Sequence, residues 1–288
     1  MKCKVCNSTK IRVHYKGKIR YGKFGQYINN QRIYLCENCH TQFFSNSKID
    51  YTDSSYRTLI QTNSNKETYY ANQDKEQLDN IEVIGFENLR GKTIADVGCG
   101  AGSFLDVVRG FTKEQIAIEP YLDYQSALSN KGYRVFDFAQ NVDNIYMRKV
   151  DIVTSFAVIE HVEDPKQFLS DMKRLVADGG YILISTPNSD DWMLDLLPET
   201  YKSFFYRYVH NWYFNKKSLE YLANELNFKK IEFIFKQKYD LSNLLLWLRD
   251  KKPSGLGTVN TLNEINCSYK KVIEKQGISN YLYAKLYV

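Results

Sequence analysis

Three glycines follow an acidic residue near position 96, in an arrangement that can bind a ligand. Asp96 stands within an apolar run, and the next residues alternate small side chains with glycine: Gly98, Cys99, Gly100 and Gly102. Glycine is needed where a backbone turns sharply or lets a ligand approach closely. The pattern predicts a buried strand, a tight turn and the start of a helix. It also predicts backbone N–H groups that face an anionic or carboxylate-bearing ligand.

Further polar residues stand where later apolar runs end. The run at 115–118 ends in Glu119 and Pro120, about twenty residues after the glycine turn, where a carboxylate can take two ribose hydroxyls. Two more runs end in Asp137 with Phe138 and in Ser155 with Phe156. The carboxyl ends of parallel strands face one crevice in an open α/β sheet. All these side chains are therefore expected at one ligand site.

The elements that must position these residues alternate between strands and helices. Apolar spacing of three or four residues predicts helices such as the one over 165–176. The sequence predicts a doubly wound α/β fold, Rossmann-like, with a mostly parallel seven-stranded sheet whose last strand is antiparallel. The expected strands are 94–97, 115–119, 133–138, 150–156, 181–188, 230–238 and 280–286.

The glycine turn closely resembles the first motif of the class I S-adenosylmethionine-dependent methyltransferases. The segments 158–165 and 179–188 are similar to the branch that contains ubiquinone-biosynthesis O-methyltransferases and sugar or capsule methyltransferases. The resemblance covers about 89–235. It implies S-adenosylmethionine as cofactor, held through Asp96, the glycines and Glu119, with Asp137 and Phe138 beside the adenine and Ser155 and Phe156 behind the sulfonium.

Methyl transfer to oxygen or nitrogen requires alignment and usually the removal of a proton. Glu160 and His161 follow the fourth strand, so His161 is a candidate general base, although it could instead order the loop. His210 lies in an aromatic segment and is the second candidate. Related metal-dependent enzymes carry a further Glu at the position of Ala157, and its absence argues against a catalytic metal.

Two Cys-x-x-Cys pairs, Cys3 with Cys6 and Cys36 with Cys39, can supply four thiolates to one metal ion. Four cysteine ligands fill the tetrahedron that zinc prefers and leave no open position, which indicates a structural zinc. The sequence thus predicts a small N-terminal zinc-ribbon-like module built on a β-hairpin, with reduced free thiols as the alternative.

The chain of 288 residues suits one α/β domain with an accessory module. The predicted parts are the module at 1–45, a linker and cleft-covering helix at 46–80, and the methyltransferase domain at 81–288. An aromatic insertion at about 190–215 is expected to form a lid over the acceptor, although ordinary core packing explains its aromatic residues equally well. The sequence shows no long apolar span or signal core, so a cytoplasmic location is expected.

Residues 1–57 carry eleven Lys or Arg and three Asp or Glu, a net charge of +8 within a chain of +6. The resemblance to sugar and capsule methyltransferases implies that the acceptor is a small polar molecule, namely a hydroxyl of a sugar, sugar nucleotide or phosphorylated sugar in surface polysaccharide biosynthesis. One alternative is an RNA methyltransferase that grips phosphates with its basic module. The other is a binding protein that holds the cofactor without turnover. The sequence does not define an oligomeric state.

Overall fold

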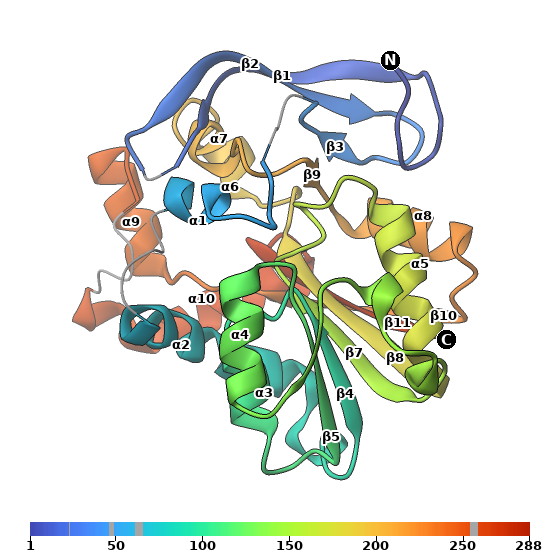
Figure 1. Cartoon of the computed structure of the whole chain (residues 1–288). Coiled ribbons are helices and arrows are strands. Elements are labelled where there is room, and N and C mark those ends of the chain that lie inside the picture. Colours follow the sequence, from blue (N-terminus) through green and yellow to red (C-terminus); the bar gives the residue numbers. More distant parts are fainter. Residues whose placement is uncertain (23, 46–48, 61–65, 254–258) are drawn as a thin grey trace. The chain divides into compact units, whose positions relative to one another are not determined.

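The computed structural model describes residues 1–288 except 23, 46–48, 61–65 and 254–258 (Figure 1). The chain divides into two compact units, which we describe separately. The first unit comprises Met1–Ser47, Ser185–Tyr221 and Phe233–Tyr283. The second comprises Lys48–Ile184, Leu222–Glu232 and Ala284–Val288.

A seven-stranded sheet has the order β10-β11-β8-β7-β4-β5-β6. Strand β4 pairs in parallel with β5 and β7, and β5 pairs in parallel with β6. The doubly wound α/β fold expected from the sequence is confirmed, and each predicted strand is present, with one of them beginning five residues earlier than expected. The strands are β4 (Thr93–Val97), β5 (Glu114–Ile118), β6 (Arg134–Phe136), β7 (Val150–Phe156), β8 (Val176–Pro187), β10 (Lys230–Lys236) and β11 (Tyr281–Tyr287).

Helices cover both faces of the parallel strands in the second unit. Helices α3 (Ser103–Val108) and α4 (Leu122–Asn130) lie on one side of β4 and β5, and α5 (Pro165–Leu175) lies on the other (Figure 1). The start of α5 is fixed by Asp164, whose Oδ1 accepts hydrogen bonds from the N–H groups of Lys166 and Gln167 at 2.9 and 3.0 Å. Strand β4 is covered by helices on both faces of the sheet, so all of its residues except Thr93 and Asp96 are apolar.

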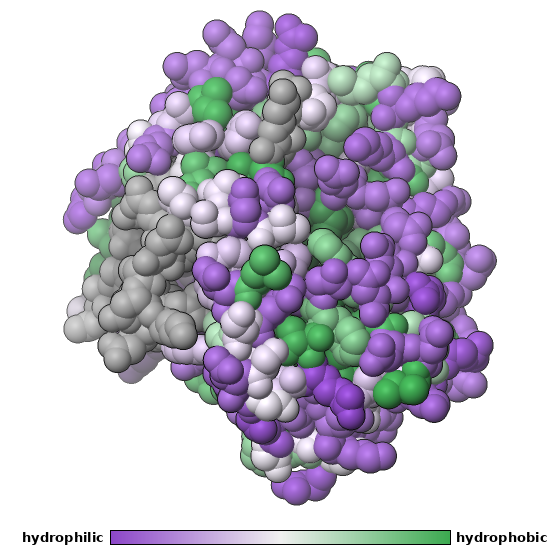
Figure 2. Space-filling view, viewed as in Figure 1, coloured by the Kyte–Doolittle hydropathy of each residue, from purple (hydrophilic) through white to green (hydrophobic). Residues whose placement is uncertain are grey.

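A four-stranded sheet of order β1-β2-β3-β9 belongs to the first unit. Strands β1 (Ile11–Arg20) and β2 (Tyr27–Cys36) form the expected hairpin, and two register shifts increase its twist. Strand β3 (Gln42–Phe43) pairs with β2 and with β9 (Trp212–Tyr213), which forms the other edge of the sheet. The viewed surface over β1 and β2, at the top of Figure 2, is mainly hydrophilic.

The core of the first unit joins segments that are far apart in the sequence. Ile19 and Ile33 from the hairpin pack with Tyr206, Tyr213 and Trp247 in one buried cluster. The Tyr206 hydroxyl donates a hydrogen bond of 2.9 Å to Gln42 in β3. Most aromatic residues of the segment at 190–215 therefore serve as core, as the packing alternative predicted.

The remaining helices lie between these strands in the chain. A helix at 263–276, which the sequence analysis did not predict, precedes the last strand. Within the described part of the chain, no helix combines the length and apolar character that crossing a bilayer requires. The helices are α1 (Ser55–Ile60), α2 (Lys66–Ile84), α6 (Met193–Leu196), α7 (Tyr201–Phe205), α8 (Lys216–Glu225), α9 (Leu241–Asp250) and α10 (Asn263–Gln276), with short 3₁₀ turns at Phe86–Asn88, Ala139–Asn141, Asn144–Tyr146 and Asn260–Leu262.

Candidate functional site

The glycine turn between β4 and α3 has a backbone that other residues adopt poorly. Gly98, Gly100 and Gly102 have φ values of 75°, 57° and 88°. A Cβ atom at Gly98 would lie 2.5 Å from Cγ2 of Val158, and one at Gly102 would lie 2.7 Å from a methyl group of Leu128. Both the positive φ and the close approach therefore require glycine here.

Most N–H groups of this turn bond within the chain, which differs from the expectation that they face a ligand. The amides of Gly98 and Cys99 donate to the carbonyl oxygen of Ile118 at 2.7 and 3.3 Å. Gly100 N–H donates to Oε2 of Glu119 at 2.9 Å, and Gly102 N–H donates to the carbonyl of Cys99 at 3.0 Å. The turn is thus held in shape before any ligand arrives.

Glu119 connects the turn to the end of β5. Its side chain is 4% exposed, and Oε1 accepts a hydrogen bond of 3.1 Å from the N–H of Tyr121. A carboxylate can accept about four hydrogen bonds, more than these two amides supply. The arrangement suits the ribose-binding role that the sequence analysis assigned to this residue.

Asp96 is a buried carboxyl group at the end of β4. Oγ1 of Thr154 donates a 2.7 Å hydrogen bond to it. Burial raises the pKa of Asp96 to about 7, the Thr154 hydrogen bond opposes this, and the charge of Glu119 adds to it. Burial also raises the pKa of the Cys99 thiol, so this cysteine is a packed neutral group. A cation bound near Asp96 and Glu119 would relieve the cost of holding two buried carboxylates together.

The other predicted cofactor residues lie at the ends of neighbouring strands. Ser155 is buried, and its hydroxyl donates to the carbonyl of Val97 at 2.8 Å. The Phe156 ring meets the Phe104 ring edge-on at 5.1 Å between centroids. Asp137 follows β6 and accepts from the Phe138 amide at 2.8 Å, while the Phe138 ring is 43% exposed. Pro120 follows Glu119 and is half-buried.

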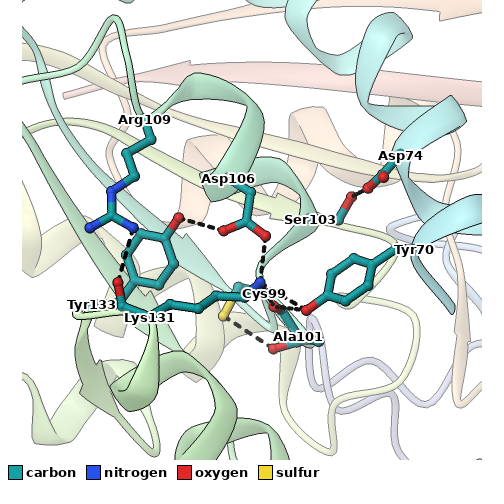
Figure 3. A network of polar contacts seen from close by, with 10 residues as sticks. Tyr70, Asp74, Cys99, Ala101, Ser103, Asp106, Arg109, Lys131 and Tyr133 are labelled. Atoms are coloured by element: carbon teal, nitrogen blue, oxygen red, sulfur yellow. Dashed lines mark hydrogen bonds and ion pairs between the residues drawn. The ribbon is translucent and has the colours of Figure 1, made fainter. Parts of the chain in front are cut away.

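A polar network that the sequence analysis did not predict supports the glycine turn (Figure 3). Lys131, directly after α4, donates to the Ala101 carbonyl at 3.0 Å and to the Tyr70 hydroxyl at 2.8 Å, and it pairs with Asp106. Tyr70 in α2 also donates to the Ala101 carbonyl, at 3.1 Å. Asp106 further accepts from the Tyr133 hydroxyl at 2.7 Å. Three helices thereby hold the middle of the turn.

A cavity of about 430 Å³ opens beside this network. It is lined by Tyr70, Asp74, Asp106, Val107 and Lys131, and the hydroxyl of Ser103 donates to Asp74 at 2.5 Å. No residue that the sequence analysis assigned to the cofactor lines this cavity. Its lining comes from α2, α3 and the residue that follows α4.

Glu160 and His161 are buried at 2% and 9% exposure after the end of β7. The Tyr51 hydroxyl lies 3.0 Å from Nδ1 of His161, and the rings of Tyr51 and Tyr56 pack against the imidazole at 5.3 and 5.4 Å between centroids. Tyr51 lies in the segment that the sequence analysis treated as linker. The hydrogen bond fixes the orientation of the His161 ring.

His210 belongs to the first unit and is 3% exposed. Its Nε2 atom lies 3.5 Å from a guanidinium nitrogen of Arg207, and its ring is tilted against the Tyr213 ring at 5.7 Å. Both candidate bases are buried, and each contacts aromatic neighbours of its own unit.

The four paired cysteines converge in the first unit. The sulfur atoms of Cys3, Cys6, Cys36 and Cys39 all lie within 4.8 Å of one another. Sγ of Cys3 is 3.6 Å from Sγ of Cys39, and Sγ of Cys6 is 3.4 Å from Sγ of Cys36. These distances are far too long for disulfides, whose S–S bond is about 2.05 Å. They are close to the edge of about 3.8 Å of a tetrahedron with Zn–S bonds of about 2.3 Å, so the donor set fits zinc.

Comparison with known proteins places this geometry in a family. Residues 69–232, more than half of the chain, match the family described as a methyltransferase domain. A probable S-adenosylmethionine-dependent methyltransferase of Mycolicibacterium smegmatis is 32% identical over 101 residues, which are 34% of this chain and 39% of that protein. A ubiquinone biosynthesis O-methyltransferase of Cupriavidus pinatubonensis is 29% identical over 121 residues, 37% of this chain and 45% of that protein. The chain thus spans less than half the length of these curated relatives.

Solved structures share the fold at low sequence identity. A SAM-dependent methyltransferase of Archaeoglobus fulgidus aligns with a TM-score of 0.50 and 18% identity, over 81% of this chain and 100% of that chain. Phosphoethanolamine N-methyltransferase 2 of Haemonchus contortus, in complex with phosphomonomethylethanolamine and S-adenosylhomocysteine, aligns with a TM-score of 0.51 and 14% identity. That alignment covers 83% of this chain and 60% of that chain. The arrangement of strands and helices described above is therefore the fold of these enzymes.

The raised pKa of Asp96 predicts a pH-dependent stability without ligand. Folding keeps the proton on this carboxyl until about pH 7, so its stabilising contribution is lost as the pH rises through that value. Replacing Asp96→Asn removes the effect. Between pH 5 and pH 8 the free energy of unfolding of the variant should therefore rise relative to wild type by about 2 kcal/mol. Urea unfolding at both pH values measures this difference, and identical pH dependence of the two proteins would contradict it.

Proposed function

We propose that this chain, which belongs to the methyltransferase domain family, transfers a methyl group from S-adenosylmethionine to a hydroxyl oxygen of a small polar acceptor. The observation that carries the proposal is the glycine turn clamped by Glu119 at the carboxyl ends of β4 and β5. The acceptor atom is proposed to be oxygen partly because several relatives carry the name O-methyltransferase.

S-adenosylmethionine, when bound, supplies an electrophilic methyl group on a positively charged sulfur atom. We propose that the Glu119 carboxylate accepts hydrogen bonds from the ribose hydroxyls. Asp96 and Glu119 would favour the cationic groups of the ligand by charge. The exposed ring of Phe138 would cover the adenine beside Asp137, and Ser155 with Phe156 would border the sulfonium. Gly98, Cys99, Gly100 and Pro120 would shape the backbone around the ligand.

His161 is our first candidate for the general base that takes the acceptor's proton. Its position after β7 puts it at the carboxyl end of a central strand, where open α/β sheets bind ligands. Tyr51 would act as a positioning residue by orienting the imidazole. Glu160, the residue before His161, is buried and adds an acidic group to the same loop. His210 is the competing base, and it lies in the aromatic segment at about 190–215 that we predict as a lid over the acceptor.

The preferred acceptor remains a sugar or sugar nucleotide of surface polysaccharide biosynthesis, and a cytoplasmic location remains a prediction. Methylation of RNA and binding without turnover are the alternatives. The support for the RNA alternative is the positive charge of the hairpin. For example, the exposed residues Lys16 and Arg32 lie opposite each other in the β1–β2 register. A salt-dependent affinity for RNA would favour that alternative.

We also propose that Cys3, Cys6, Cys36 and Cys39 bind one structural zinc ion. The hairpin alone buries little apolar surface, so a metal would replace part of the missing stabilisation. The zinc site would hold the two knuckles that precede β1 and follow β2. Four sulfur ligands leave no position for a substrate, so no catalytic role is assigned to this metal.

The cofactor assignment predicts that Glu119→Gln weakens binding of S-adenosylhomocysteine by about tenfold or more, because the variant loses charge and acceptor capacity. Gly98→Val should abolish binding, since its side chain would collide with Val158. Gly110→Ala is the matched control, because a Cβ there meets nothing within 4 Å. Titration calorimetry measures all three affinities. Unchanged affinity in both test variants would disprove the assignment.

The base assignment predicts that His161→Gln lowers kcat by roughly a hundredfold or more while leaving cofactor affinity nearly unchanged. Turnover is followed as release of S-adenosylhomocysteine, with an acceptor found in a panel of nucleotide sugars and phenols. Tyr51→Phe should lower kcat less and displace the pH profile, with little change in KM. If His210→Gln loses turnover and His161→Gln keeps it, His210 is the base instead. If both keep turnover, alignment alone explains the rate.

The zinc assignment predicts about one zinc per chain by elemental analysis of the purified protein, as a single four-cysteine site requires. Cys39→Ser should lose the metal and destabilise the whole first unit, because the hairpin shares a buried core with Tyr206 and Trp247. Cys267→Ser is the control, since that cysteine is exposed and lies apart from the cluster. Full stability of the metal-free protein would contradict a structural role.

A further inference from the structure

Arg20, the last residue of β1, is a cation held among aromatic side chains of the first unit. Its guanidinium carbon lies 4.1 Å from the centre of the Phe204 ring. Its Nε atom is buried and has no hydrogen-bond partner. Its backbone is fixed, because Arg20 N–H donates to the carbonyl of Tyr206 at 2.9 Å and its own carbonyl accepts from the amide of Tyr208 at 2.8 Å.

The charged groups around Arg20 include no carboxylate that pairs with it. Burial is the largest influence on the pKa of Arg20 and lowers it, together with the positive charge of Arg207, to about 9. The other groups that act on it are the hydroxyls of Tyr239, Tyr213 and Tyr27. Among the described residues, Arg20 makes no ion pair within 4 Å. The carboxylate of Asp191 accepts a hydrogen bond of 2.6 Å from the Tyr201 hydroxyl. Asp191 and Arg20 both act on the pKa of Tyr201.

Arg207 is a second cation without an acidic partner in the part of the chain that the structure describes. Its side chain reaches Nε2 of His210 at 3.5 Å. Its backbone N–H donates to the Tyr213 hydroxyl at 2.7 Å, and its carbonyl accepts from the same hydroxyl at 3.0 Å. Arg20 and Arg207 form an isolated parallel β-bridge, so the two residues are adjacent by backbone pairing.

Two adjacent cations without a counter-charge are costly when water is partly excluded. An anion removes this cost, and the planar guanidinium group matches a phosphate group with two parallel hydrogen bonds. Arg20 and Arg207 are both partly exposed residues, although Nε of Arg20 is buried. Tyr21 and Phe24 nearby in the hairpin are 41% and 42% exposed, and the ring centroids of Phe24 and Phe204 lie 6.2 Å apart. Exposed aromatic faces next to a cation suit a ring-bearing phosphate ester.

We infer that Arg20 and Arg207 form a phosphate-binding site for a small, ring-containing phosphorylated ligand such as a nucleotide or a sugar phosphate. This inference rests on the proposed function in one respect, because such a ligand would be the acceptor or a part of it. The site itself is built entirely from residues of the first unit. The competing explanation is that Arg20 only packs on Phe204 and contributes to stability.

The test uses the full-length protein and titration calorimetry with pyrophosphate and with uridine diphosphate. We expect wild type to bind both probes. Arg207→Gln should weaken each affinity by about tenfold or more, because a charge-assisted bidentate contact is lost. Arg20→Lys keeps the charge but loses the planar fork and should also weaken binding. Arg32→Gln, an exposed arginine in β2, is the control and should bind like wild type.

Three other outcomes would overturn the inference. Absence of pyrophosphate binding by wild type, or equal binding by Arg207→Gln, would overturn the inference and leave Arg20 as a packing residue. Tighter binding of a short single-stranded RNA than of uridine diphosphate, lost in the same variants, would also overturn it in favour of a polymer site. S-adenosylhomocysteine is titrated into the same samples. If the protein binds S-adenosylhomocysteine but not pyrophosphate, only this inference is rejected. If it binds pyrophosphate but not S-adenosylhomocysteine, only the proposed function is rejected.

Discussion

The hydrogen bond from the Gly100 amide to the Glu119 carboxylate is the interaction on which the proposed cofactor site depends. It joins the turn after β4 to the end of β5, the adjacent parallel strand. Because glycine has more conformational freedom than other residues, contacts outside this turn of three glycines help to maintain its shape. Glu119 provides one such contact, and the Lys131 network at the Ala101 carbonyl provides another. The site is thus preorganised by protein contacts on two sides.

The first unit obeys a different constraint, since its hairpin is too small to fold on its own core. The hairpin packs on aromatic residues of segments from 185–221 and 233–283, so one cluster stabilises all three. Four converging sulfur atoms offer a metal site at the other end of the hairpin. The guanidinium of Arg20 lies over the Phe204 ring, which packs against this cluster, and no carboxylate is among the groups that act on the pKa of Arg20.

The sequence indicated the fold well, because apolar runs and glycine turns are local signals. The strands around Asp96 and Glu119 were predicted within a few residues, and both acids were expected at the same edge of the sheet. Lys131, Tyr51 and Arg20 were not found, because their roles depend on partners 30 to 187 positions away that no local pattern encodes. The prediction that the amides of the turn face a ligand was also wrong for Gly98, Cys99, Gly100 and Gly102. These N–H groups donate hydrogen bonds to acceptors of the protein itself.

The central claim is that the cofactor binds at the turn after β4 with its ribose on Glu119. A crystal structure of the protein with S-adenosylhomocysteine tests this most directly. The account predicts that both ribose hydroxyls lie within about 3.2 Å of the Glu119 carboxylate oxygens, the range of ordinary hydrogen bonds. It also predicts that the adenine lies beside Phe138. Density for the ligand elsewhere, with Glu119 out of hydrogen-bond reach of the ribose, would contradict the claim.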